Sequence, residues 1–245
     1  MIPSVVERLV SRLHPLLNPL AAVRANTLEV RDLACLKKAF GWTKDPLLDA
    51  PHLQEFNYLA DLNERRLRDA ESLMTVCCNA GGKTIVEIGT ATGHTTALMA
   101  RNAPSSTVHT VNIPPDEIEE GGERVTRAFS RDDIGHAYRE QGCTNVRQIF
   151  ANTLHWEPDV GTIDVAFIDG CHDTDFVFND TRKVLAHMKP GSFVLWHDFN
   201  PELVDQYEWI KSVCLGVERL YERGLINGRI LHMRDSWVGI YQVPK

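Results

Sequence analysis

This chain of 245 residues lacks a long apolar run, a signal peptide, an excess of basic residues and C-x-x-C pairs, and each absence argues against a class of protein. No stretch approaches the ~20 consecutive apolar residues of a membrane span, and charges interrupt the apolar run Met1–Val10, so no signal peptide is expected. The formal net charge of −7 argues against a nucleic-acid or anionic-membrane partner. The six cysteines form no C-x-x-C pair, which argues against a zinc site or a disulfide framework. We therefore expect a cytoplasmic protein with reduced cysteines.

What is present indicates an α/β protein in two parts. Apolar residues make up 43% of the chain, enough for one sizeable core with an appendage. Residues 1–80 show helical spacing, including a helix predicted over 26–40, and no convincing strand. We expect them to form an N-terminal helical cap, either over the substrate side, at a dimer contact or in a purely structural role. Residues 81–245 alternate strands with helices and end in a hairpin of 229–233 and 237–243, which predicts a doubly wound, mostly parallel sheet.

The first strand of this second part leads into a glycine turn. Thr84–Ile88 is apolar enough for a buried parallel strand, Gly89–Gly93 turns the chain, and Thr95–Arg101 begins a helix. Such a unit forms a cofactor cradle, because glycine lets the backbone approach a ligand and the free N–H groups of the helix face it. The turn reads G-x-x-x-G, whereas a dinucleotide site would read G-x-G-x-x-G. Glu87, two residues earlier, can attract an ammonium group, which favours an amino-acid-bearing cofactor.

This turn resembles motif I of the class I S-adenosylmethionine (SAM) methyltransferases. It is most similar to the catechol O-methyltransferase-like branch, in which a hydroxyl residue follows the turn as Thr95 does here. The resemblance implies SAM as cofactor and a seven-stranded sheet whose last strand is antiparallel. It also implies a set of cofactor-binding residues at the ends of the first four strands of the second part, and these are Glu87, Gly89, Thr90, Thr92, Gly93, Thr95, Asn112, Asn152, Thr153 and Asp169. Asn112 stands where the family usually places an acid for the ribose hydroxyls.

Two later strands end in polar motifs. The strand Ile163–Ile168 runs into Asp169-Gly-Cys-His172, which resembles the F-I-D-G-x-H motif of small-molecule O-methyltransferases. The next strand ends in His197-Asp198, and together the motifs resemble bacterial SAM-dependent methyltransferases that include metal-dependent macrolide-sugar O-methyltransferases. The resemblance implies methyl transfer to a hydroxyl of a small molecule, such as a sugar or a natural product. It implies Asp169 and His172 as catalytic residues, with His172 as the general base.

The same motifs imply a metal. Neighbouring strands lie ~5 Å apart, so Asp169, His197 and Asp198 are expected to converge on one cation. Oxygen-rich sites favour Mg²⁺ or another divalent ion, which would lower the pKa of a substrate hydroxyl. In related metal-dependent enzymes the position of His197 is usually Glu or Asp, and an imidazole there favours a transition metal. A metal-free site that uses His172 alone is the alternative.

Other interpretations stay open at this stage. Asp169 can be the N-cap of the following turn, and His172 an ordinary loop histidine. An NAD(P)-dependent Rossmann oxidoreductase would share the strand–turn–helix unit, but it should show G-x-G-x-x-G and an acid about 20 residues later. A non-catalytic SAM-binding protein would lose the polar groups after the two later strands. The segment 113–142 holds either a lid or the next helix. The expected partner is a small hydroxylated molecule, not nucleic acid or a membrane, and a homo-oligomer is open.

Overall fold

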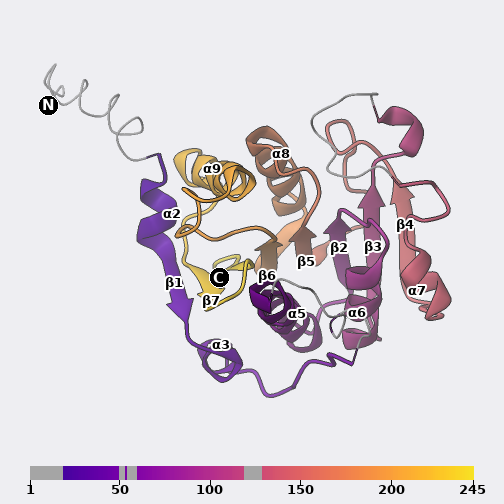
Figure 1. Cartoon of the computed structure of the whole chain (residues 1–245), viewed down its shortest axis with the longest axis horizontal. Helices are drawn as coiled ribbons and strands as arrows, with labels where there is room; N and C mark the ends of the chain where they lie inside the picture. Colours follow the sequence, from indigo (N-terminus) through magenta and orange to yellow (C-terminus); the bar gives the residue numbers. More distant parts are fainter. Residues whose placement is uncertain (1–18, 50–52, 54–59, 119–128) are drawn as a thin grey trace, which may run out of the picture.

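The structure, a computed structural model, describes residues 19–49, 53, 60–118 and 129–245 (Figure 1). Its helices are α2 (Ala21–Asn26), α3 (Leu33–Phe40), α5 (Ala60–Asn79), α6 (His94–Asn102), η1 (Pro115–Glu117), α7 (His136–Glu140), α8 (Thr174–Leu185) and α9 (Glu208–Glu222). Its strands are β1 (Thr27–Val30), β2 (Thr84–Ile88), β3 (Thr107–Asn112), β4 (Val146–Phe150), β5 (Ile163–Ile168), β6 (Met188–Trp196), β7 (Ile230–Met233) and β8 (Gly239–Gln242). Within these residues, no helix has the length and hydrophobicity that a bilayer crossing requires.

The strands form one sheet in the order β1-β7-β8-β6-β5-β2-β3-β4. Neighbouring strands are parallel except for β8, which runs antiparallel to β6 and to β7. The chain winds outward from the central strand β2 in both directions, first to β3 and β4 and then to β5 and beyond. The predicted doubly wound sheet with a closing hairpin is therefore confirmed. In such sheets a ligand binds beyond the carboxyl ends of the strands where the winding reverses, which here is the end of β2.

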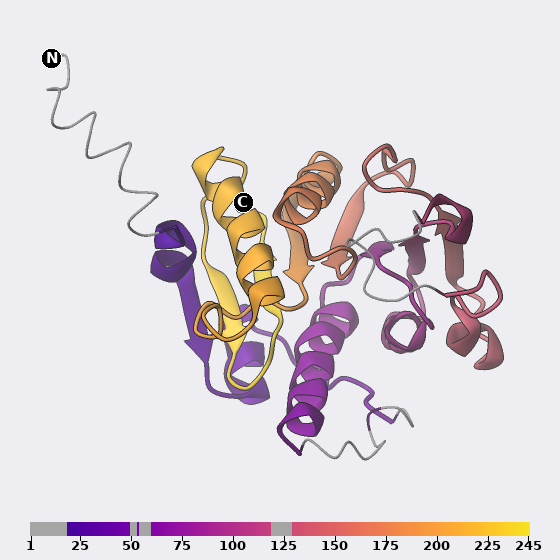
Figure 2. The ribbon, with the colours of Figure 1, turned by 45° about the horizontal axis from the view of Figure 1, so that its top comes forward.

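Helices cover both faces of this sheet (Figure 1). On one face α2, α8 and α9 pack against Val86, Ile88 and the alternate residues of the neighbouring strands. On the other face α3, α5, α6 and α7 pack against Ile85, Val165 and their neighbours. Helices α8 and α9 lie side by side in both views (Figures 1 and 2). Successive strand residues point to opposite faces. A strand that packs against both helical layers therefore needs apolar residues at nearly every position, as in β5.

The prediction of seven strands was wrong, because the sheet contains eight strands in the described part of the chain. The additional strand, β1, interrupts the helix predicted over 26–40 and pairs with β7, Thr27 opposite Ile230. A new helix, α3, then begins where the Asp32 side chain accepts a hydrogen bond from the N–H of Cys35 at 2.9 Å. The free edge of β7 supplies a partner that helical spacing alone does not reveal. Since β1 lies inside residues 1–80, the division into a cap (1–80) and a catalytic domain (81–245) stays a prediction.

The segment 113–142 contains α7, so the prediction of a further helix in this segment is confirmed. Helix α7 lies next to α6 at the side of the sheet that carries β3 and β4 (Figure 1). Residues 119–128 lie outside the described part of the chain, and the alternative of a lid falls there.

Candidate functional site

A cavity of about 400 Å³ opens at the carboxyl ends of β2, β3, β4 and β5. This volume is in the range of small-molecule and cofactor sites. All of the predicted cofactor-binding residues except Glu87 line it, namely Gly89, Thr90, Thr92, Gly93, Thr95, Asn112, Asn152, Thr153 and Asp169. His172 also lines the cavity, whereas His197 and Asp198 are not part of its wall. The structure therefore brings the predicted cofactor cradle and the predicted base to one cavity.

The glycine turn after β2 is shaped by close backbone packing. Gly89 has φ +103°, and a Cβ there would lie 2.0 Å from the carbonyl oxygen of Asp169. Only glycine fits this position, and its packing ties the turn to the end of β5. The turn is also held from the other side, because Gly135 and Ala137 donate backbone hydrogen bonds to the carbonyls of Ala91 (2.9 Å) and Thr92 (3.0 Å). The cradle is thus fixed before any ligand binds.

Glu87 is turned away from the cavity. Its carboxyl group is fully buried and accepts hydrogen bonds from the hydroxyls of Thr96 (2.5 Å) and Thr110 (2.6 Å). Thr110 in turn bonds to the hydroxyl of Thr90 at 2.7 Å. Burial raises the pKa of Glu87 to about 8, although the two threonine bonds oppose the shift. Glu87 therefore links β2, α6 and β3 beneath the turn, and contact with a cofactor ammonium group is left as a prediction.

We expect the substitution Glu87→Gln to remove a pH dependence of stability. The ordinary pKa of the group is 4.5, so between about pH 4.5 and pH 8 the folded chain keeps a proton that the unfolded chain has lost. Stability then falls as pH rises through this window. At pH 8 the free energy of unfolding of the neutral variant should exceed that of wild type by about 2–5 kcal/mol, and at pH 5 the two should be similar. Urea unfolding at both pH values measures this difference, with Glu140→Gln, an exposed position, as the control. Parallel pH profiles of wild type and Glu87→Gln would contradict the assignment.

The predicted polar groups after β3 and β4 are held by the backbone. The Asn112 side chain accepts from the N–H of Ala91 (3.1 Å) and donates to the carbonyl of Ile113 (2.9 Å). The Asn152 side chain accepts from the N–H of Leu154 at 3.1 Å. Each amide retains further hydrogen-bonding capacity toward the cavity. These side chains are thus oriented in advance, as a binding site requires.

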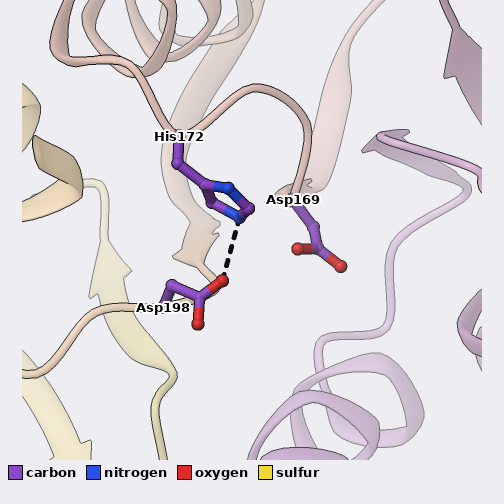
Figure 3. Close-up of side chains that lie close together, drawn as sticks. All are labelled: Asp169, His172 and Asp198. Atoms are coloured by element: carbon purple, nitrogen blue, oxygen red, sulfur yellow. Dashed lines mark ion pairs between the residues drawn. The ribbon is translucent and has the colours of Figure 1, made fainter. Parts of the chain in front are cut away.

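The ends of β5 and β6 bring together Asp169, His172 and Asp198 (Figure 3). Nε2 of His172 lies 2.9 Å from Oδ2 of the buried Asp198. Burial lowers the pKa of His172, but the hydrogen bond and the negative charge of Asp198 outweigh it, so the pKa is raised above its ordinary 6.5. Burial opposes ionisation of Asp198, yet the two histidines hold its pKa well below the usual range. The arrangement is a carboxylate–imidazole pair with its imidazole on the cavity wall.

His197 contacts the carboxylates of both Asp169 and Asp198. Its Nδ1 lies 3.0 Å from Oδ1 of Asp169 and 3.1 Å from Oδ2 of Asp198. Burial lowers the pKa of His197, but the charges of Asp169 and Asp198 raise it well above 6.5. The structure thus brings the three predicted metal ligands together, with the ring of His197 bonded to both carboxylates.

Two residues at this site were missed by sequence reasoning. Oδ2 of Asp69, on α5, lies 3.5 Å from Nε2 of His197. Nε1 of Trp209 donates to Oδ1 of Asp198 at 3.3 Å. Neither residue belongs to a motif. Asp69 does carry one signal, since it lies four residues before the buried Leu73 and so places an acid on the apolar face of its helix.

Fold and site define a class of protein. A doubly wound sheet with one antiparallel strand near its edge, a glycine turn after the central strand and a cavity where the winding reverses form the Rossmann-like fold of class I methyltransferases. Residues 86–199 match the model of a family described as a methyltransferase domain. This match runs from β2 to the residue after Asp198, so it contains the glycine turn and the carboxylate–imidazole pair. This part of the chain is thus similar to a methyltransferase domain, which supports the class that the sequence resemblance implied.

Solved structures with this fold include three that cover most of the chain. The O-methyltransferase NovP has 17% sequence identity and a TM-score of 0.53 over 76% of this chain and 79% of its own. The O-methyltransferase TomG from Streptomyces achromogenes, which is involved in tomaymycin synthesis and was solved with SAM, has 16% identity and a TM-score of 0.51 over 87% and 88%. The Podospora anserina methyltransferase PaMTH1, bound to S-adenosylhomocysteine, has 14% identity and a TM-score of 0.52 over 100% and 99%. No curated protein sequence matches the chain. At these identities the likeness is one of fold.

Proposed function

We propose that the protein transfers a methyl group from SAM to a hydroxyl group of a small molecule, with His172 as the general base. One observation carries the proposal. His172 lies on the wall of the cavity that the glycine turn also lines, and its Nε2 is 2.9 Å from Oδ2 of Asp198. The similar O-methyltransferases NovP and TomG support oxygen as the acceptor atom.

The residues of the cavity fit SAM. Its volume of about 400 Å³ and its position at the glycine turn suit a nucleoside-sized ligand. Thr92, Thr95, Asn112 and Asn152 would hold polar groups of the ligand, and the first N–H groups of α6 face the same space. When bound, SAM supplies an electrophilic methyl group on a sulfonium centre.

The chain's own residues supply the proton transfer. With the N–H of Nε2 donating to Asp198, Nδ1 of His172 is the basic nitrogen that takes the proton of the acceptor hydroxyl. Asp198 then stabilises the imidazolium that forms and keeps the ring in one orientation. Because the pKa of His172 is raised, the base form increases as pH rises above 6.5, and activity should increase with it.

The donor set does not fit the predicted metal. Nδ1 of His197 lies 3.0 Å from Asp169 and 3.1 Å from Asp198, and an imidazole pairs with carboxylates in this way through its N–H. Asp169, His172 and Asp198 offer ligand atoms within 4.8 Å of one another. Nε2 of His172 is already paired with Oδ2 of Asp198 at 2.9 Å. No step of the mechanism therefore runs through a metal.

Several finer expectations belong to this proposal. The acceptor is a small polyhydroxylated molecule, such as a sugar or a glycosylated natural product, and the net charge of −7 supports a partner other than nucleic acid. A cytoplasmic location, the helical cap formed by residues 1–80 and assembly into a homo-oligomer are parts of the same proposal.

Calorimetric titration of S-adenosylhomocysteine into the purified protein tests the cofactor class. We expect saturable binding in the micromolar range, in the presence and in the absence of EDTA. A parallel titration with NAD⁺ is the control and should show no binding. Binding of NAD⁺ alone would favour the oxidoreductase alternative, and binding of neither ligand would leave the glycine turn a purely architectural feature. Binding without methyl transfer to any hydroxylated acceptor would favour the non-catalytic SAM-binding alternative.

A further inference from the structure

His197 is surrounded by carboxylates that face both of its ring nitrogens. Nδ1 lies 3.0 Å from Oδ1 of Asp169 and 3.1 Å from Oδ2 of Asp198. On the opposite side of the ring, Nε2 lies 3.5 Å from Oδ2 of Asp69. A neutral imidazole has one N–H and one lone pair, so one of its nitrogens would face a carboxylate unfavourably. The protonated ring carries a positive charge that faces carboxylates on both sides, and so it matches its surroundings.

The neighbours of His197 are fixed independently of it. Asp69 accepts hydrogen bonds from the hydroxyl of Ser236 (3.0 Å) and from the backbone N–H of Trp237 (2.6 Å). Asp198 accepts from Trp209 at 3.3 Å through its other oxygen. The ring of Phe167 packs edge-on against the imidazole, with 6.0 Å between centroids. The site is therefore built from α5, β5, β6, the β7–β8 turn and the start of α9, and it holds the imidazole in one place.

A positive charge is needed at this point. The carboxylates of Asp169 and Asp198 lie close together and are largely removed from solvent, and two such groups repel each other unless a cation lies between them. A divalent metal is a common counter-charge for paired carboxylates. Here the ring nitrogen of His197 contacts both of them.

We propose that His197 is a positioning residue whose imidazolium holds Asp169 and Asp198 together, in the position from which a divalent metal would bridge them. For its catalytic consequence the inference rests on the proposed function, because Asp198 in turn orients His172. The wild-type site is then independent of metal. Replacing the cation by a carboxylate creates three acids that face one point, which is the ligand set of a hard divalent ion.

Titration calorimetry with Mn²⁺ alone tests this inference at neutral pH. We expect no saturable binding to wild type and one Mn²⁺ per chain for His197→Asp. The matched variant His197→Asn, which has the same shape without the charge, should bind at least about tenfold more weakly than His197→Asp. Stoichiometric binding to wild type would overturn the inference, and so would a folded His197→Asp variant that fails to bind Mn²⁺.

A second measurement does not depend on whether the His197→Asp variant folds. Nitrogen NMR of the histidine rings in wild type should show His197 with protons on both nitrogens at neutral pH, and EDTA should leave the signals unchanged. The spectrum of His197→Asn assigns them. A neutral ring, or signals that change when EDTA is added, would overturn the inference. Neither measurement requires SAM or an acceptor. The inference about His197 can therefore be overturned while the proposed methyl transfer holds, and methyl transfer can be overturned while the inference holds.

Discussion

Replacing His172 by alanine is expected to lower turnover by about 10²–10⁴-fold while leaving the affinity for S-adenosylhomocysteine within about twofold of wild type. The imidazole lies on the cavity wall, where it can take the acceptor proton, and alanine places no base at this position. The glycine turn and the amides of Asn112 and Asn152 are held by backbone contacts that do not involve His172. Steady-state kinetics and calorimetry of the same preparation measure the two effects.

Asp198→Asn is the companion variant for this experiment. Asp198 raises the pKa of His172, so loss of its charge should lower that pKa and move the acid limb of the kcat/KM profile to lower pH. Alanine at position 172 should abolish this limb. A His172→Ala enzyme that retains wild-type turnover would remove His172 from the mechanism. Loss of S-adenosylhomocysteine binding would instead make His172 a cofactor-binding residue.

The second large effect is expected for Gly89→Ala. Gly89 has φ +103°, where an L side chain is strained, and its added Cβ would lie 2.0 Å from the carbonyl oxygen of Asp169. Backbone strain and overpacking together should cost about 2–6 kcal/mol of unfolding free energy. Because the clash is with backbone, relief must move the turn or the end of β5, and both line the cavity. Affinity for S-adenosylhomocysteine should therefore fall as well. Urea unfolding and calorimetry measure the two losses.

The variant Gly191→Ala separates the cost of backbone strain from the cost of the clash with Asp169. Gly191 has a similar φ of +92°, but nothing lies within 4 Å of an added Cβ. This variant should cost about 1–3 kcal/mol from strain alone and leave ligand binding unchanged. The difference between the variants is the contribution of the close approach to Asp169. Equal losses in both would mean that the packing against Asp169 yields easily.

The central features of the fold could be predicted because their signals are local. β5 was predicted at its observed bounds, since a mostly apolar run that ends in Asp169-Gly170 is typical of a buried parallel strand. The glycine turn and the closing hairpin carry equally local signals. β1 could not be predicted in this way, because its four residues become a strand only through pairing with β7. β6 begins at Met188, earlier than the helical pattern suggested, because Lys189-Pro190-Gly191 reads locally as a helix stop.

At the site, the residue types were predictable and their partners were not. The motifs identified His172 and Asp198, but a contact across two strand ends depends on the twist and register of the sheet. Glu87 was predicted to attract a cofactor ammonium group, and this stays a prediction; its bonds to Thr96 and Thr110 follow from the burial of β2 on both faces, which the motif does not reveal. Asp69 came from a helix without a motif. Tertiary packing places these side chains, and the spacing of residues along the sequence does not reveal that packing.

The pairing of β1 with β7 has a consequence for how the protein is made. Thr27 and Ile230 lie opposite each other in the sheet, although roughly 200 residues separate them along the chain, so closing this edge carries a large loop-closure entropy. On a ribosome that adds about 5–20 residues per second, β1 waits on the order of 10–40 s for its partner. Until residue 233 has emerged, β1 has no strand beside it, and the half of the sheet built on β2, β3 and β4 can form first. Because β7 joins the rest of the sheet only through β8, the edge formed by β1, β7 and β8 is the last part of the sheet to assemble during synthesis.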